Sequence, residues 1–173
     1  MALAGVAQAQ TLDSTILGFD KNNNQIFSVD LLAQAATTPT PYTYTYMATL
    51  KSISTTAPVN VNTFSFHFDP NVPVVYVSST PTYAEASLAP GAFSFGTTTG
   101  LTRVGDKATF VFTSPFPPSG SVGVSANSDI GGGGVGSLGP GPAAVPEAGT
   151  FALLGLGLLP LALVARRRMA RSN

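Results

Sequence analysis

Apolar and polar residues alternate with a period of two through most of residues 10–127. The clearest runs are YTYTYM at 42–47, FSFHFD at 64–69, FVFT at 110–113 and VGVSA at 122–126. Because successive side chains of a β-strand point to opposite faces of the sheet, each run predicts a strand with one buried face. No stretch of this region keeps a helical period for three turns, so the pattern favours an all-β domain.

Turn-forming residues separate the alternating runs. The segment DKNNN at 20–24 stands between ILGF and QIFSVDLL, which is typical of a β-hairpin. Further turns are predicted at 69–71, 96–100, 105–107 and 115–120. About eight or nine short strands with one apolar face each predict an antiparallel β-sandwich over residues 10–127.

Composition and charge narrow the classes of function. Charged residues make up 9% of the 173 residues, against roughly 25% in ordinary soluble domains. The absence of cysteine excludes disulfides and thiolate metal sites. Residues 10–145 carry four basic and seven acidic side chains, a net charge of −3, whereas residues 166–171 hold four arginines. An acidic body argues against a nucleic-acid partner, because such binding needs a basic face.

The segments before and after the predicted sandwich lack its alternating pattern. Residues 128–145 contain seven Gly and two Pro in 18 positions, so we expect a flexible linker that holds the sandwich off the membrane. Residues 1–9 end in Ala7-Gln8-Ala9, which fits the cleavage pattern of a secretory signal peptide. We interpret residues 1–9 as the remnant of a signal peptide, and the alternative is a flexible end.

Residues 151–165, FALLGLGLLPLALVA, carry no charge and predict one short C-terminal transmembrane helix. At about 1.5 Å per residue this helix spans roughly 22 Å, less than the ~30 Å hydrocarbon core. Pro160 would kink it, so we expect a temporary tether rather than a permanent anchor. A buried core helix is disfavoured because the segment has no polar face. Arg166, Arg167 and Arg168 follow at once and are expected to stay in the cytoplasm, which places the sandwich outside it.

The residues before this apolar span carry a family resemblance. Val145, Pro146, Glu147, Gly149 and Thr150 resemble the start of PEP-CTERM sorting signals, and LLGLGLLPLALVARRR resembles their continuation. Ala148 stands where that pattern has a second proline. The resemblance covers about 24 of 173 residues and makes residues 146–173 the sorting signal.

This resemblance implies that an exosortase, a protease-transpeptidase of the inner membrane, recognises the motif and processes the protein for the cell surface. The run from VNTFSFHFDPNV to VVYVSS also resembles strands of cohesin-like and carbohydrate-binding-module sandwiches, which supports the predicted fold class.

Three groups of residues suggest chemistry. Ser65, His67 and Asp69 are the residue types of a catalytic triad, but neighbours on one strand face lie about 6.6 Å apart and cannot form its hydrogen bonds. Residues 20–24 begin like a calcium loop, yet Gln25 and Leu31 stand where that loop needs Gly and Glu, so we expect a hairpin turn and no metal site.

The tyrosine row Tyr42, Tyr44 and Tyr46 is a candidate glycan platform, because exposed aromatic rings stack on sugars; the alternative is a half-buried strand face.

From the terminal segments we expect an exported, membrane-tethered precursor that becomes a cell-surface or extracellular protein. It would be a non-enzymatic structural or adhesive component of the envelope or exopolysaccharide layer, without cofactor. The alternative function is a glycan-binding module that uses the exposed tyrosine row. A hydrolase that acts on envelope polymers is disfavoured, because it would need two facing carboxylates and acidic residues are sparse.

Overall fold

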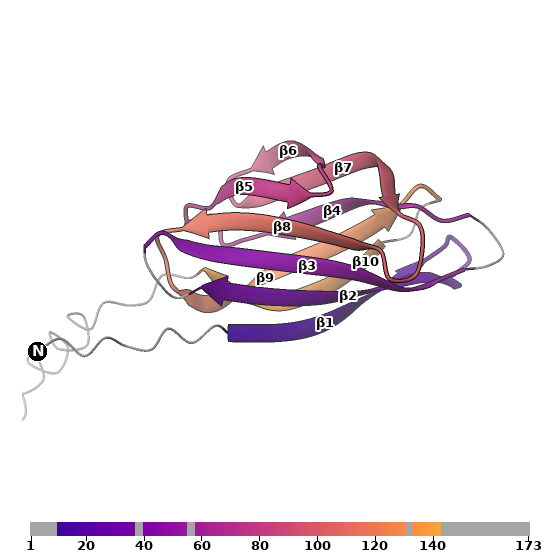
Figure 1. Cartoon of the computed structure of the whole chain (residues 1–173), viewed down its shortest axis with the longest axis horizontal. Helices are drawn as coiled ribbons and strands as arrows, with labels where there is room; N and C mark the ends of the chain where they lie inside the picture. The colour runs from indigo at the N-terminus through magenta and orange to yellow at the C-terminus, as the bar shows by residue number, and fades with distance from the viewer. Residues whose placement is uncertain (1–9, 37–39, 55–57, 131–132, 143–173) are drawn as a thin grey trace, which may run out of the picture.

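The predicted strands form two antiparallel five-stranded sheets, which the computed structural model describes for residues 10–36, 40–54, 58–130 and 133–142. In sheet order, the first sheet comprises β1 (Gln10–Phe19), β2 (Gln25–Ala36), β3 (Tyr42–Ile53), β8 (Lys107–Ser114) and β5 (Val75–Thr80). The second comprises β10 (Gly133–Pro142), β9 (Pro118–Ser128), β4 (Val61–His67), β7 (Ala92–Leu101) and β6 (Ala84–Ala89). Figure 1 shows the first sheet in front of the second. The predicted all-β architecture is confirmed.

Aromatic side chains fill the space between the two sheets. Phe66 of β4 in the second sheet lies 5.0 Å from Phe110 and 5.2 Å from Phe112, both on β8 of the first sheet. The fully buried aromatic residues are Phe27, Tyr44, Tyr46, Phe64, Phe66, Phe95, Phe110 and Phe112. Such tilted and edge-on ring pairs contribute about 0.5–1.5 kcal/mol each beyond the area that they bury. The aromatic positions of the alternating pattern therefore lie on the inner faces of the two sheets and form the core between them.

The hairpin predicted at residues 20–24 connects β1 to β2. The Asp20 carboxylate accepts hydrogen bonds from the backbone N–H groups of Asn22 and Asn24, both at 2.8 Å. Asn23 has a φ of 64°, a left-handed conformation that asparagine tolerates better than most residues. These hydrogen bonds hold the pKa of Asp20 below its usual value, the side-chain and backbone bonds from Asn24 being the main cause.

The structure corrects several of the predicted boundaries, and residues 118–120 of the turn predicted at 115–120 already belong to β9. Residues 96–100, predicted as a turn, belong to β7, and residues 133–142 of the predicted flexible linker form β10. Leu138 of β10 is buried in the core, so the folded domain extends to Pro142 and contains ten strands rather than eight or nine. The prediction of a flexible linker over residues 128–145 is therefore wrong for residues 133–142.

Close backbone approach explains why glycine suits both of these strands. A Cβ added at Gly141 of β10 would lie 2.8 Å from the backbone carbon of Ser121 on β9. A Cβ at Gly100 of β7 would lie 2.1 Å from the carbonyl oxygen of Val61 on β4. Glycine thus marks places where two strands come unusually close, which a local reading of the sequence takes for turns.

No helix within the described ranges has the length and hydropathy that crossing a bilayer requires. The predicted signal-peptide remnant at residues 1–9 and the predicted transmembrane helix at residues 151–165 both lie outside the described residues.

Candidate functional site

The predicted tyrosine platform is not a surface feature. Tyr44 and Tyr46 are 0% exposed, and Tyr42 is partly buried against the core. The Tyr44 hydroxyl donates to the carbonyl oxygen of Phe116 at 2.6 Å, and the Tyr46 hydroxyl donates to that of Pro140 at 3.1 Å. The prediction of an exposed glycan-stacking row was therefore wrong, because backbone acceptors allow these phenols to lie inside the sandwich.

Burial also determines the protonation of this row. Desolvation raises the pKa of the Tyr44 and Tyr46 phenols well above the usual value. Both side chains therefore remain neutral hydrogen-bond donors over the physiological range of pH. Through these hydrogen bonds Tyr44 joins β3 to the segment after β8, and Tyr46 joins β3 to β10.

Ser65, His67 and Asp69 do not form a catalytic triad. The Ser65 hydroxyl bonds the hydroxyl of Ser94 on β7 at 3.3 Å. The Asp69 carboxylate accepts the backbone N–H of Asn71 at 2.9 Å, within its own turn. His67 is exposed at the end of β4. Ser65 and His67 thus lie on β4, whereas Asp69 lies in the turn that follows it, and the hydrogen bonds of Ser65 and Asp69 go to other residues.

The described residues contain no group of three or more His, Cys, Asp or Glu side chains that could hold a metal ion. The apparent start of a calcium loop at residues 20–24 is the hairpin turn described above. Both carboxylate oxygens of Asp20 accept hydrogen bonds within that turn, Oδ2 from the Asn24 side chain at 3.1 Å.

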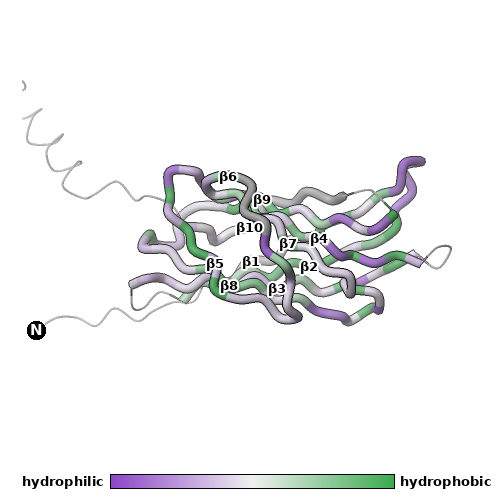
Figure 2. Tube along the Cα trace, turned by 90° about the horizontal axis from the view of Figure 1, so that it is seen from above, coloured by the Kyte–Doolittle hydropathy of each residue, from purple (hydrophilic) through white to green (hydrophobic). Residues whose placement is uncertain are grey.

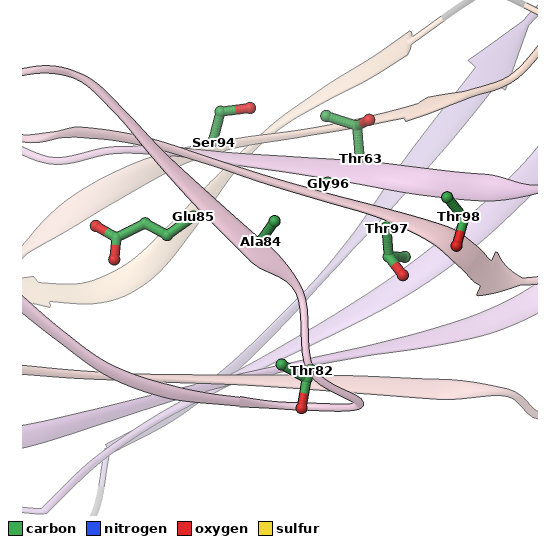
Figure 3. Close-up of a pocket in the computed structure, with 8 residues that line it drawn as sticks. All are labelled: Thr63, Thr82, Ala84, Glu85, Ser94, Gly96, Thr97 and Thr98. Carbon is green, nitrogen blue, oxygen red and sulfur yellow. The ribbon is translucent and has the colours of Figure 1, made fainter.

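An open depression of about 680 Å³ lies over β6, β7 and the neighbouring part of β4. Figure 3 shows its hydroxyl groups, which come from Thr63, Thr82, Ser94, Thr97 and Thr98. Glu85 is the one ionisable group in its lining and extends away from Thr97 and Thr98. The depression can exchange hydrogen bonds with a polar ligand, but it contains neither a nucleophile–base pair nor two facing carboxylates.

Tyr83, between β5 and β6, is a feature that the sequence did not reveal. Its side chain is 3% exposed and packs against Phe64 and Phe110, yet its hydroxyl has no hydrogen-bond partner among the described residues. Burial raises the pKa of this phenol to about 12, with a smaller contribution from the charge of Asp106. No local sequence signal distinguishes it from the partnered Tyr44 and Tyr46.

The predicted sorting residues, Val145, Pro146, Glu147, Gly149 and Thr150, lie outside the described residues, as do Arg166, Arg167 and Arg168. Comparison of the chain with protein-family models, with curated proteins and with solved structures produced no match.

Proposed function

We propose that this chain is an exported envelope protein, delivered by a C-terminal sorting signal of the PEP-CTERM type and acting as a non-enzymatic structural or adhesive component. The observation that carries the proposal is the order of three features within residues 145–168. A VPEAGT motif precedes an uncharged 15-residue span, and an arginine cluster follows the span. The partners are the inner membrane, an exosortase-type enzyme and the exopolysaccharide layer.

The physical roles of the three features agree with one another. The span at residues 151–165 is short for a permanent anchor, which suits a precursor that is held at the membrane only until it is processed. Arg166, Arg167 and Arg168 remain on the cytoplasmic side and thereby orient the preceding sandwich outward. The motif then lies on the outer side of the membrane, where it is available to the processing enzyme.

The folded domain adds a constraint to this arrangement. Its last strand ends at Pro142, three residues before Val145, so the sandwich ends almost directly before the sorting motif. A domain with an aromatic core and an open, hydroxyl-lined depression suits a structural or adhesive component better than an enzyme. The single carboxylate of that depression, Glu85, lacks the partner that hydrolysis of a glycan would need.

The experiment is to express the full chain in a bacterium that carries an exosortase, followed by cell fractionation and intact-mass measurement of the mature protein. Pro146→Ala and Glu147→Ala should each leave the C-terminal segment attached. Ala148→Pro restores the full motif and should increase the processed fraction. Ala144→Pro adds a proline just before the motif and serves as the control, with no such increase expected.

Recovery of the mature protein from the cytoplasm would refute the assignment to the envelope. A surface protein whose mass is unaffected by Pro146→Ala and Glu147→Ala would instead refute recognition through this motif.

A further inference from the structure

One margin of the sandwich has unpaired sheet edges. The two sheets end in β1 and β10 on one side, and these two strands lie against each other. On the opposite side the sheets end in β5 and β6, which appear along the upper margin in Figure 1. β5 pairs with β8 alone, so one row of its backbone donors and acceptors has no partner within a sheet.

β5 lacks charge and proline, two of the features that protect an edge strand. Such strands usually carry charged residues or proline, which discourage pairing with another chain. β1 contains Asp13, β6 contains Glu85 and β10 contains Pro140, whereas β5, with the sequence VYVSST, has neither charge nor proline. Its residues are also types that favour extended structure.

Apolar side chains are exposed along the same strand. Val75 is 62% exposed and Val77 is 54% exposed, and they are two of the five large hydrophobic side chains exposed in the described part of the chain. Tyr76, between them, points inward and packs 4.8 Å from Phe95. Figure 2 looks down on this margin and shows the hydrophobic stretch at the start of β5.

The pairing of β5 with its own sheet is interrupted at one residue. The register shifts between Tyr76 and Ser78, so Val77 has no partner residue on β8. Meanwhile the Tyr76 hydroxyl donates to the Ser79 hydroxyl oxygen at 2.9 Å, and Ser79 in turn accepts the backbone N–H of Tyr83 at 3.0 Å. The inward side chains Tyr76 and Ser79 thus hold β5 in place. Its backbone edge opposite β8 has no strand partner and is available to another chain.

We propose that β5 of one molecule pairs antiparallel with β5 of a second copy of this chain. A two-fold axis places such a strand opposite its own sequence, so any charge on it would face the same charge on the partner. β5 carries no charge, and neither do the β8 residues paired with it, which are residues 109–113. Residues 10–145 carry a net charge of only −3, so long-range repulsion between copies is weak.

The product is a continuous sheet of ten strands, five from each copy. The pairing satisfies backbone groups of both edges and removes Val75 and Val77 from water. Because both copies use the same edge, the contact closes as a dimer and does not grow into a fibre. The inference needs only the sandwich and holds or fails independently of the sorting signal.

Disulfide trapping tests the contact directly, because the chain contains no cysteine. Val75→Cys and Val77→Cys are introduced separately and together into the full chain in detergent micelles, followed by mild oxidation. Residues directly opposite each other in an antiparallel pair have Cα atoms within the range that a disulfide can join. A single variant traps a pair in which that residue faces its own copy, and the double variant also traps a pair in which Val75 faces Val77. We expect a covalent dimer with at least one of the three variants. Val104→Cys, at a residue 62% exposed in the turn before β8, is the control and should form no covalent dimer.

Analytical ultracentrifugation of lysine variants provides the second test. Val77→Lys places like charges at the contact and should convert the dimer to a monomer, halving the protein mass of the particle. Val104→Lys should leave the dimer intact, and both variants should keep the far-UV circular dichroism spectrum of the parent, because both side chains are exposed and their replacement leaves the fold unchanged. A monomeric parent chain, a dimer that survives Val77→Lys, or equal cross-linking at the Val104→Cys control would each overturn the proposal.

Discussion

Tyr46 and Tyr83 are both buried, but only one of their hydroxyl groups has a partner. Tyr46 donates to the carbonyl oxygen of Pro140 on β10 at 3.1 Å. Tyr83 has no hydrogen-bond partner among the described residues. Replacing each by Phe keeps the ring contacts, which include Phe66 for Tyr46 and Phe110 for Tyr83. We therefore predict opposite effects on stability from the same chemical change.

The expected magnitudes follow from the fate of each hydroxyl. Tyr46→Phe removes a hydrogen bond with a net contribution of about 1 kcal/mol and leaves the buried Pro140 carbonyl without this donor, so we expect a loss of about 1–2 kcal/mol. Tyr83→Phe removes a buried hydroxyl without a partner and should stabilise the fold by about 1 kcal/mol. For a domain of this size each kcal/mol shifts the thermal midpoint by roughly 2–5 °C.

The assay is urea and thermal unfolding of the parent and the two variants at one pH, with the denaturant slope checked for constancy. Tyr44→Phe is a useful second reference, because its hydroxyl also has a backbone acceptor, at 2.6 Å. A neutral Tyr46→Phe would show that β10 is not docked on the sandwich as described. A Tyr83→Phe variant as destabilised as Tyr46→Phe would show that the Tyr83 hydroxyl does have a partner.

Three further predictions concern the same sandwich. Leu138→Ala should cost about 2–5 kcal/mol in urea unfolding because Leu138 is buried, whereas Leu17→Ala, at a residue 42% exposed, should change stability much less. Gly100→Ala should destabilise strongly because its Cβ would overlap a backbone oxygen of β4; Gly96→Ala, on the same strand, meets nothing within 4 Å and should be tolerated in the same thermal scan. The Tyr83 pKa of about 12 exceeds the ordinary value of 10.0, so between these values the folded state binds more protons than the unfolded state. Stability should therefore fall as the pH rises through this window, less steeply in Tyr83→Phe, and a urea midpoint independent of pH would contradict the assignment.

The local pattern of the sequence determined the type of secondary structure and several of the turns. Alternation at residues 64–69 predicted β4 with its phenylalanines on one face, and Phe64 and Phe66 are indeed buried. The hairpin at residues 20–24 could be predicted from the sequence because the Asp20 carboxylate stabilises it by hydrogen bonds from the backbone two and four positions later. Both features depend on neighbours in the chain, which is why sequence periodicity and turn chemistry reveal them.

Which face of a strand is buried, and which strands lie at an edge, depends on partners far away in the sequence. The hydroxyl of Tyr46 is accommodated inside the sandwich because a carbonyl oxygen 94 residues later accepts its hydrogen bond, and no pattern around residue 46 indicates that acceptor. The glycines of β10 are compatible with a strand because β9 supplies a backbone to pair with. Likewise, the run VYVSST predicts a strand, but only the pairing of β8 with β3 on one side and β5 on the other makes β5 the end of its sheet. The sequence alone thus determined most of the strands and the candidate sorting motif. The tertiary structure decided burial, the last strand of the domain and the free edge, because these depend on contacts between distant segments.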